Sequence, residues 1–379
     1  MESDVTLEPE DDATIFYTSG TTGKPKGALG SQRNICGNLL SLGFSAARGA
    51  ARSASSSTPI GETATAPAQS AYLLSVPFFH ATGCHSILVA NTAAGGKLVL
   101  MRKWDPERAL ELIERERITI FGGVPSMAWQ VLDSPDFQKR DTSSVASIGY
   151  GGAPAPPELV RRIEEMFPGR TPSNGYGLTE TSSVTTMNSG DDYLTHPDSV
   201  GTPVPICDLK TVDPAGEELP AGEVGELWIR GPNVVKGYWH KPAETAQTFS
   251  DGWLHTGDVA RIDEEGFVYI VDRAKDMVIR GGENVYCVEV EAALFEHPAV
   301  SDAAVIGIPH QVLGEEVGAV VTRKTGAEVT EEELRRHVAS RLAAFKVPVR
   351  IWFRSEPLPR NPAGKILKQE LRNELVTRH

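Results

Sequence analysis

A ten-residue segment near the start of the chain combines the groups that bind phosphate. It reads Thr18-Ser19-Gly20-Thr21-Thr22-Gly23-Lys24-Pro25-Lys26-Gly27. Glycines let backbone amides approach phosphate oxygens, hydroxyl groups donate further hydrogen bonds, and ammonium groups offset negative charge. It is not a Walker A loop, because two residues rather than four separate Gly20 from Gly23, and Pro25 stands where a Mg²⁺-binding Ser or Thr would follow. The sequence therefore predicts a polyphosphate-binding loop after a buried-type strand at Ala13–Tyr17, in preference to a Gly- and Thr-rich surface hairpin.

Seven further motifs follow this loop along the chain. They read Pro77-Phe78-Phe79-His80, Gly151-Gly152-Ala153-Pro154, Asn174-Gly175-Tyr176-Gly177-Leu178-Thr179-Glu180, Trp253-Leu254-His255-Thr256-Gly257-Asp258, Asp272-Arg273-Ala274-Lys275-Asp276, Arg280-Gly281-Gly282-Glu283-Asn284-Val285-Tyr286 and Pro359-Arg360-Asn361-Pro362-Ala363-Gly364-Lys365-Ile366. In composition and order they resemble the adenylate-forming superfamily of acyl-CoA synthetases, peptide-synthetase adenylation domains and beetle luciferases. The resemblance extends over essentially the whole chain, which makes it far more specific than any single motif.

The resemblance implies a nucleotide site assembled from several of these motifs. Its expected residues are Thr18, Ser19, Gly20, Thr21, Thr22, Gly23, Lys24, Gly152, Ala153, Pro154, Asn174, Gly175, Tyr176, Gly177, Thr179, Asp258, Ile270, Arg273 and Lys365. In this interpretation the Tyr176 ring lies against adenine, the Thr179 hydroxyl bonds the α-phosphate, Glu180 is the Mg²⁺ ligand and Asp258 accepts both ribose hydroxyls. Taken alone, Tyr176 is more simply a core residue and Asp258 a turn acid.

The resemblance also implies catalytic residues and a mobile C-terminal part. The expected catalytic residues are Lys365, Thr179, Glu180 and His80, the last as a gate to the acid pocket. Lys275 is the expected hinge, with a plain charged linker as the alternative. The segment expected to reach coenzyme A (CoA) after rotation about that hinge consists of Gly281, Gly282, Glu283 and Asn284. Two adjacent glycines would let backbone approach a narrow pantetheine channel.

The expected activity is that of an ATP-dependent acid:CoA ligase, with ATP, Mg²⁺ and CoA as cofactors and substrates. The segment around Gly281 and the following Val288-Glu289-Val290-Glu291 look most like fatty-acyl-CoA synthetases. Glycines near the expected acid pocket, around Gly149–Gly151, favour an elongated aliphatic acid over an aryl acid. Two alternatives stay open: an acyl-AMP ligase that loads a carrier protein, and a nucleotide-binding remnant without turnover. The second arises because the family's large segment before the phosphate loop is expected to be missing.

Alternating apolar runs and helical patterns position these motifs. Strands are predicted at Ala13–Tyr17, Tyr72–Val76, Lys97–Leu100, Ile118–Phe121 and Val145–Tyr150, and helices at Pro106–Arg117 and Pro156–Phe167. Asp105 and Thr330 are predicted N-caps. The predicted fold is α/β: a large multi-subdomain domain with α/β residues 1–199 and a β-rich subdomain at 200–272, followed by a small mobile α+β lid at 273–379. Residues Arg48–Ser70 are Ala-, Ser-, Thr- and Pro-rich and are predicted to be a mobile insertion.

Composition narrows the protein class further. The 379 residues carry a formal net charge of −13, which argues against a general nucleic-acid-binding surface. The four cysteines form no pair or cluster with metal-site spacing, which favours a reducing, cytoplasmic compartment. No run of 18 apolar residues is present, so no transmembrane span is expected. Peripheral membrane contact and homo-oligomer formation stay open.

Overall fold

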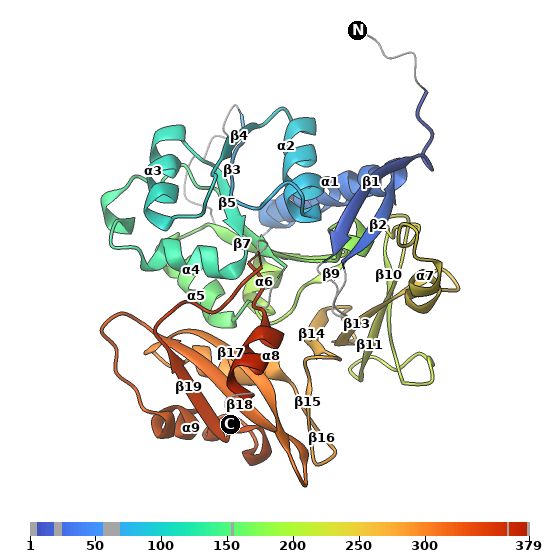
Figure 1. The fold of residues 1–379 in the computed structure, drawn as a ribbon. Coiled ribbons are helices and arrows are strands. Elements are labelled where there is room, and N and C mark those ends of the chain that lie inside the picture. Colours follow the sequence, from blue (N-terminus) through green and yellow to red (C-terminus); the bar gives the residue numbers. More distant parts are fainter. Residues whose placement is uncertain (1–5, 19–24, 56–68, 153–154, 362–363, 377–379) are drawn as a thin grey trace. The chain divides into compact units, whose positions relative to one another are not determined.

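The computed structural model describes residues 6–18, 25–55, 69–152, 155–361 and 364–376 (Figure 1). Residue contacts divide the chain into two compact units. The first comprises Met1–Glu223, Leu227–Thr256 and Ile262–Tyr269, and the second comprises Val224–Glu226, Gly257–Arg261 and Ile270–His379. Both units mix helices and strands, and the predicted α/β class is confirmed.

A seven-stranded sheet in the order β4-β3-β5-β6-β7-β8-β9 forms the centre of the first unit. Its strands are β3 (Ala71–Leu74), β4 (Lys97–Leu100), β5 (Ile120–Gly123), β6 (Ser147–Gly151), β7 (Thr171–Tyr176), β8 (Thr186–Ser189) and β9 (Thr202–Pro203). Strands β3 to β7 run parallel, whereas β8 and β9 are antiparallel to their neighbours. Helices α3 (Pro106–Glu116), α4 (Pro125–Asp133) and α5 (Pro157–Met166) lie side by side over this sheet and share one apolar core with it (Figure 1).

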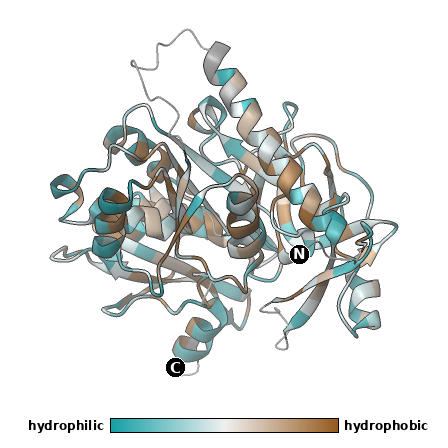
Figure 2. Cartoon of the chain, turned by 90° about the horizontal axis from the view of Figure 1, so that it is seen from above, coloured by the Kyte–Doolittle hydropathy of each residue, from teal (hydrophilic) through white to brown (hydrophobic). Residues whose placement is uncertain are grey.

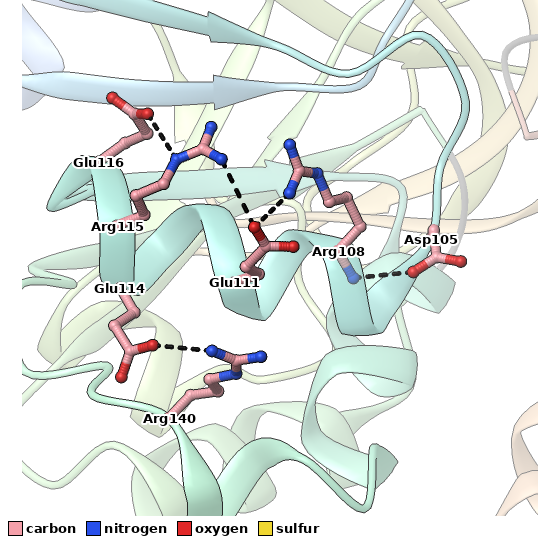
Figure 3. Close-up of polar contacts among 7 residues, drawn as sticks. All are labelled: Asp105, Arg108, Glu111, Glu114, Arg115, Glu116 and Arg140. Atoms are coloured by element: carbon pink, nitrogen blue, oxygen red, sulfur yellow. Dashed lines mark hydrogen bonds and ion pairs between the residues drawn. The ribbon is translucent and has the colours of Figure 1, made fainter.

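Helix α3 illustrates how local sequence sets an element. The Asp105 carboxylate accepts the backbone N–H of Arg108 at 2.7 Å, which confirms the predicted N-cap. Ion pairs join Glu111 to Arg108 and Arg115 along the outer face (Figure 3). Exposed pairs of this kind contribute little stability. The helix is therefore held mainly by its buried apolar face, which consists of Ala109, Leu110, Leu112 and Ile113.

Two predictions about the start of the chain are wrong in part. Within the described residues, β1 (Asp12–Thr18) pairs with β2 (Lys26–Ser31) alone, as a two-stranded antiparallel ribbon, and it is not a buried strand of the main sheet. The exposed fraction of Tyr17 is 65%. The predicted mobile insertion begins inside helix α1 (Gln32–Ser55), because alanine and arginine favour helix and carry the helix through Arg48. Residues 56–68 of the insertion lie outside the described part of the chain.

The remaining elements before Arg273 are mostly short. A π-helix, η1 (Thr82–Val89), leads into α2 (Ala90–Ala93). Other short helices are η2 (Phe137–Lys139), η3 (Thr179–Thr181), α6 (Asp191–Thr195) and α7 (Pro242–Thr248). A five-stranded sheet has the order β10-β11-β13-β12 with β14 beside β13, comprising β10 (Asp208–Val212), β11 (Val224–Arg230), β12 (Phe249–Ser250), β13 (Trp253–Ile262) and β14 (Val268–Arg273).

The second unit continues with a sheet in the order β16-β15-β18-β17, with β19 parallel to β18. Its strands are β15 (Val278–Arg280), β16 (Glu283–Val285), β17 (Val300–His310), β18 (Gly314–Arg323) and β19 (Arg350–Arg354). Its helices are α8 (Cys287–Phe295), α9 (Glu331–Ala339), η4 (Ala344–Lys346) and α10 (Lys368–Val376). Thr330 and Glu333 form the predicted capping box of α9. The helices carry alternating bands of hydrophobic and hydrophilic residues (Figure 2), as expected of elements with one buried face.

Candidate active site

The segment from Leu178 to Ser183 forms a tight turn shortly after β7. The Thr181 hydroxyl oxygen accepts the backbone N–H of Leu178 at 2.9 Å. Ser182 and Ser183 adopt positive φ angles of 55° and 118°. Non-glycine residues pay a conformational cost there, so the surrounding structure must hold the turn in place. The predicted ligand residues Thr179 and Glu180 lie on this turn.

Tyr238 fixes the Glu180 side chain. Its hydroxyl group donates to Oε1 of Glu180 at 2.7 Å, and the backbone N–H of Val235 donates to the Glu180 carbonyl at 2.9 Å. Burial is the main cause that raises the pKa of Tyr238 above its ordinary value, and the negative charge of Glu180 is the second. The hydroxyl therefore keeps its proton and remains the donor. The Lys26 ammonium lies over the Tyr238 ring at 4.6 Å from its centroid. The structure thus brings a lysine of the phosphate motif and the predicted Mg²⁺ ligand to one tyrosine.

A second histidine, which none of the sequence motifs contains, supports the same turn. His85 on η1 is 1% exposed, and its Nδ1 lies 3.1 Å from the Ser182 carbonyl oxygen. The hydroxyl oxygens of Ser86 and Ser183 lie 2.6 Å apart. Burial lowers the pKa of His85, so the neutral ring donates through Nδ1. The π-helical winding of η1 is a rare backbone form that often occurs at functional sites.

His80, the predicted gate, lies just before η1. Its Nδ1 accepts the backbone N–H of Thr82 at 3.3 Å, and burial lowers its pKa, so the ring is neutral near pH 7. The exposed fraction of the neighbouring Phe79 is 67%. The structure therefore gives His80 a local hydrogen bond and places an exposed aromatic ring next to it in the chain.

Several glycines of the motifs are required by the fold itself. A Cβ atom on Gly177 would lie 1.5 Å from the Ser183 carbonyl oxygen, and one on Gly151 would lie 2.3 Å from the Gly175 carbonyl oxygen. A Cβ on Gly149 would lie 3.2 Å from the Ser173 hydroxyl oxygen. Close approach of neighbouring backbone explains Gly177 and Gly151, while the space beside Gly149 is limited by the Ser173 side chain. They therefore give no support to the prediction of space for an elongated acid.

Asp258 and Arg273, two predicted nucleotide ligands, lie together in the second unit. Nε of Arg273 donates to Oδ1 of Asp258 at 3.0 Å, and Asp258 is 2% exposed. Gly257, before Asp258, has φ of 67° and accepts the backbone N–H of Ala274 at 3.0 Å. This bond joins the strand carrying Asp258 to the chain that follows Arg273. The pair forms a fixed, charged group of the kind that binds polar ligands.

The loop that carries Lys365 is closed by hydrogen bonds across its base. The backbone N–H of Lys365 donates to Oδ1 of Asn361, and the backbone N–H of Asn361 donates to the Lys365 carbonyl, both at 2.9 Å. Gly364 has φ of 86°, a left-handed conformation that favours glycine. Gly364 and the bonds between Asn361 and Lys365 thus define the conformation of the described part of this loop.

Lys365 lies in an environment that disfavours its charge. Burial, followed by the charges of Arg273 and Lys275, lowers the pKa of the ammonium group from 10.5 to about 7. Asp276 and Asp258 act in the opposite direction. The second unit therefore brings together four predicted residues, namely Lys365, Arg273, Lys275 and Asp258. A nearby anion raises the pKa of such a lysine and favours its protonated form, so Lys365 is suited to bind a phosphate or a developing oxyanion.

The predicted hinge and CoA segment form a turn followed by a hairpin. Backbone N–H groups of Asp276 and Met277 donate to the Arg273 carbonyl, so Lys275 lies within a turn. Strands β15 and β16 pair with Arg280 opposite Glu283, which leaves Gly281 and Gly282 as a two-residue loop with φ of 60° and 92°. These angles are those of a type I′ turn, which requires positive φ at both central residues. The hairpin turn thus explains both glycines without a ligand.

Some predicted residues lie outside the described part of the chain. They are Ser19, Gly20, Thr21, Thr22, Gly23, Lys24, Ala153 and Pro154. Among the described residues, no three His, Cys, Asp or Glu side chains gather as a metal site. Mg²⁺ commonly takes one carboxylate together with substrate phosphates and water. The hydrogen-bonded carboxylate of Glu180 fits that donor set.

Comparison with known proteins identifies the family. Residues 1–239 match the family described as AMP-binding enzyme, and residues 289–365 match the AMP-binding enzyme C-terminal domain. The first match covers more than half of the 379 residues. The chain therefore belongs to the AMP-binding enzyme family, and the predicted membership of the adenylate-forming superfamily is confirmed.

Particular relatives share most of this chain. It is 39% identical to the long-chain-fatty-acid–CoA ligase of Bacillus subtilis (strain 168), over 98% of this chain and 64% of the ligase. It is 36% identical to a feruloyl-CoA synthase of Amycolatopsis sp, over 97% of this chain and 71% of the synthase. Among solved structures, ATP-bound MatB from Rhodopseudomonas palustris has a TM-score of 0.84 and 35% identity, over 98% of this chain and 70% of that chain. The chain thus spans 64% to 71% of the lengths of these relatives.

Helix length and composition bear on membrane insertion. Of the helices within the described ranges, none is long and apolar enough to span a bilayer.

Proposed function

We propose that this protein is an ATP-dependent, AMP-forming acid:CoA ligase. The observation that carries the proposal is the placement of Lys365 in the electrostatic field of Arg273 and Asp258, because a family member needs a cation at the reacting phosphate and a ribose ligand near it. The Glu180 turn supplies the Mg²⁺ ligand. The four cysteines are free, which fits the cytoplasmic location proposed for the enzyme.

The first proposed half-reaction forms acyl-AMP. A carboxylate oxygen of the acid attacks the α-phosphorus of ATP, the bond to the bridging oxygen breaks, and pyrophosphate leaves. Lys365 stabilises the charge that develops on the α-phosphoryl oxygens, while Thr179 and Asp258 orient the nucleotide. Mg²⁺, held by Glu180, would offset the charge of the phosphates.

The second proposed half-reaction transfers the acyl group to CoA. The CoA thiolate sulfur attacks the acyl carbonyl carbon, the bond to the phosphate oxygen breaks, and AMP leaves. We propose that the lid, residues 273–379, rotates about Lys275 between the steps, so that Lys365 leaves and the hairpin carrying Gly281, Gly282, Glu283 and Asn284 arrives. A lid exchange of this kind lets one site perform two reactions.

The proposed acid is a fatty acid. The relative named as a long-chain-fatty-acid–CoA ligase supports this choice, whereas the feruloyl-CoA synthase supports an aromatic acid as the second candidate. Saturated acids of increasing length and ferulic acid should be incubated with ATP, Mg²⁺ and CoA, and AMP and thioester measured. Equal amounts of AMP and a fatty-acyl thioester are expected. Acyl-AMP and pyrophosphate without CoA thioester would instead favour a carrier-protein acceptor, and a product from ferulate alone would select the aromatic acid.

Asp258→Asn is expected to weaken ATP binding. The amide keeps the size of the side chain but lacks the negative carboxylate. That carboxylate pairs with Arg273 and is proposed to accept hydrogen bonds from both ribose hydroxyls. Charge-assisted hydrogen bonds of this type predict a KM for ATP raised ~10–100-fold. The same measurement with 2′,3′-dideoxy-ATP provides the control, because the variant should lose the preference for intact ribose. An Asp258→Asn enzyme that retained the full preference would contradict the ribose assignment.

Adenylate formation is expected to depend on the protonation of Lys365. Its pKa is lowered to about 7, so the free enzyme loses the required ammonium charge as pH rises through that value. Bound ATP raises the pKa again, so kcat/KM for ATP should decline at lower pH than kcat does. Rates measured between about pH 6 and pH 9 test this. A Lys365→Arg variant should lose the inflection near neutrality; the same inflection in that variant would assign it to another group.

A further inference from the structure

A buried ion cluster lies behind the Lys365 loop in the second unit. Nζ of Lys368 lies 2.7 Å from Oε1 of Glu291, with side-chain exposures of 19% and 11%. Asp272, which is 2% exposed, adds a second buried carboxylate whose charge interacts with Lys368. Burial opposes the ammonium charge, but Glu291 and Asp272 outweigh it and raise the pKa of Lys368. Lys368 is therefore a charged lysine paired with Glu291, and the charge of Asp272 favours its protonated form.

The members of this cluster come from the three places that the proposed lid must coordinate. Asp272 is one residue before Arg273 and three before the hinge residue Lys275. Glu291 lies in the middle of α8. Lys368 is the first residue of α10 and follows Lys365 by three residues. The cluster thus links the hinge strand, the lid core and the end of the catalytic loop.

Hydrogen bonds make each acid part of the framework. Oδ1 of Asp272 accepts the backbone N–H of Arg273 at 2.7 Å, and Oδ2 accepts the backbone N–H of Cys287 at the N-terminus of α8. Oε1 of Glu291 also accepts the backbone N–H of Val305 on β17 at 2.7 Å. Carboxylates held by backbone groups have little freedom to move. The ion pair with Glu291 consequently defines the position of Lys368 relative to α8 and β17, and Asp272 adds a fixed negative charge at the hinge.

The other end of the loop has an anchor of its own. NH2 of Arg360 lies 2.6 Å from Oδ2 of Asp302, and NH1 donates to the Gly364 carbonyl at 2.7 Å. Arg360 and Ile366 also form an isolated antiparallel bridge. Ion pairs thus fix the loop on both sides of Lys365, the first to β17 and the second to α8.

We propose that Lys368 is a positioning residue for Lys365, holding the catalytic loop in the register that adenylate formation requires. The inference rests on the proposed function. A buried ion pair adds little net stability compared with apolar packing, but it defines a unique arrangement because neither charge tolerates separation. Loss of the Lys368 ammonium leaves two buried carboxylates unbalanced and frees the start of α10, so Lys365 no longer has one defined position.

The matched control is Lys346, a second lysine paired with α8. Nζ of Lys346 lies 2.6 Å from Glu289, and its side chain is 19% exposed, the same as that of Lys368. Lys346 belongs to η4, before β19, and has no hydrogen bond to the Lys365 loop among the described contacts. Lys346→Met therefore removes a lysine–glutamate pair from the same helix without touching that loop.

The experiment compares Lys368→Met, Lys368→Arg and Lys346→Met in the full chain. ATP–pyrophosphate exchange reports adenylation, and CoA transfer from supplied acyl-AMP reports the second step. Lys368→Met should reduce the exchange rate ~10–100-fold, the effect of small misplacement of a catalytic group, while transfer stays within about twofold. Lys368→Arg should recover most of the exchange, and Lys346→Met should behave as wild type. Equal loss of both steps in Lys368→Met, or the same loss in Lys346→Met, would overturn the proposal.

A double variant tests whether Lys368 acts through Lys365. If it does, adding Lys368→Met to Lys365→Ala should cause no further loss of exchange. If the two substitutions reduced the exchange rate multiplicatively, the positioning role would be overturned. Hydrogen exchange of the amides of residues 358, 360–361 and 364–367 adds a readout independent of activity: they should exchange faster in Lys368→Met but not in Lys346→Met. Absence of pyrophosphate exchange in the wild type would refute the proposed function, whereas unchanged amide protection in Lys368→Met would refute the positioning role by itself.

Discussion

Replacement of Lys365 by alanine is expected to lower the rate of acyl-AMP formation ~100–1000-fold, the typical effect of removing one preorganised group that stabilises transition-state charge. The alanine variant lacks the ammonium group that directly follows Gly364 in this loop. Its backbone bonds to Asn361 do not involve the side chain and should persist. The fold of the loop is therefore expected to survive, and the loss should fall on chemistry.

The second half-reaction separates this account from a general loss of structure. Lys365→Ala supplied with synthetic acyl-AMP and CoA should form thioester at a rate within about threefold of wild type, because the lid exchange removes Lys365 from that step. Chromatographic measurement of AMP release and thioester provides both rates. Comparable losses in the two half-reactions would contradict the assignment of Lys365 to adenylation alone.

Glu180→Gln is expected to lower adenylation ~100-fold and to raise the Mg²⁺ concentration needed for half-maximal rate. The amide oxygen can still accept the Tyr238 hydroxyl hydrogen, so the turn should stay in place. What is lost is the negative charge, and a hard divalent cation depends on that charge for binding. Titration of the exchange rate with Mg²⁺ measures the effect.

Tyr238→Phe is the matched control for the Glu180 variant. It removes the hydrogen bond to Oε1 but leaves the carboxylate charged, so its effect should be no more than about tenfold, the range of one hydrogen bond to a charged group. The Mg²⁺ dependence of Tyr238→Phe should remain close to that of wild type. A normal Mg²⁺ requirement in Glu180→Gln would show that Glu180 is not the metal ligand.

Local rules predicted much of the secondary structure. Asp105 and Thr330 cap their helices as expected, because a side-chain acceptor and the backbone amide three residues later lie close in any helix of that register. Lys97–Leu100 is a strand with the predicted bounds. The extension of α1 beyond Arg48 was missed, because small and polar residues are too poor in apolar surface to predict order, yet alanine favours helix wherever a helix has already begun.

The sequence predicted less of the candidate site than of the secondary structure. Glu180 and Asp258 were named from their motifs, but the groups that hold them were not. Tyr238 lies 58 residues from Glu180 in the sequence, and His85 lies 97 residues from Ser182. Neither contact leaves a periodic or local signal, because tertiary packing alone brings these segments together. The nearest available signal was the second histidine, five residues after His80, in a helix directly following a predicted site motif.

For the glycines, the motifs suggested ligand-binding roles at positions that backbone geometry alone explains. Gly281 and Gly282 occupy a hairpin loop that requires positive φ, and Gly177 accommodates the Ser183 carbonyl. A sequence reports that a glycine is present but not which neighbour excludes a side chain. The roles of these residues in ligand binding therefore rest on the proposed reaction and not on their type.

Acid-dependent ATP–pyrophosphate exchange in the absence of CoA measures the proposed adenylation half-reaction by itself. The assay needs the intact adenylation site and no acyl acceptor, so it isolates the reaction assigned to Glu180, Asp258 and Lys365. We expect incorporation of labelled pyrophosphate into ATP that requires both Mg²⁺ and a carboxylic acid, and we expect Lys365→Ala to reduce it strongly. Binding of ATP without acid-dependent exchange, over a panel of aliphatic and aromatic acids, would contradict it and leave a nucleotide-binding protein without turnover.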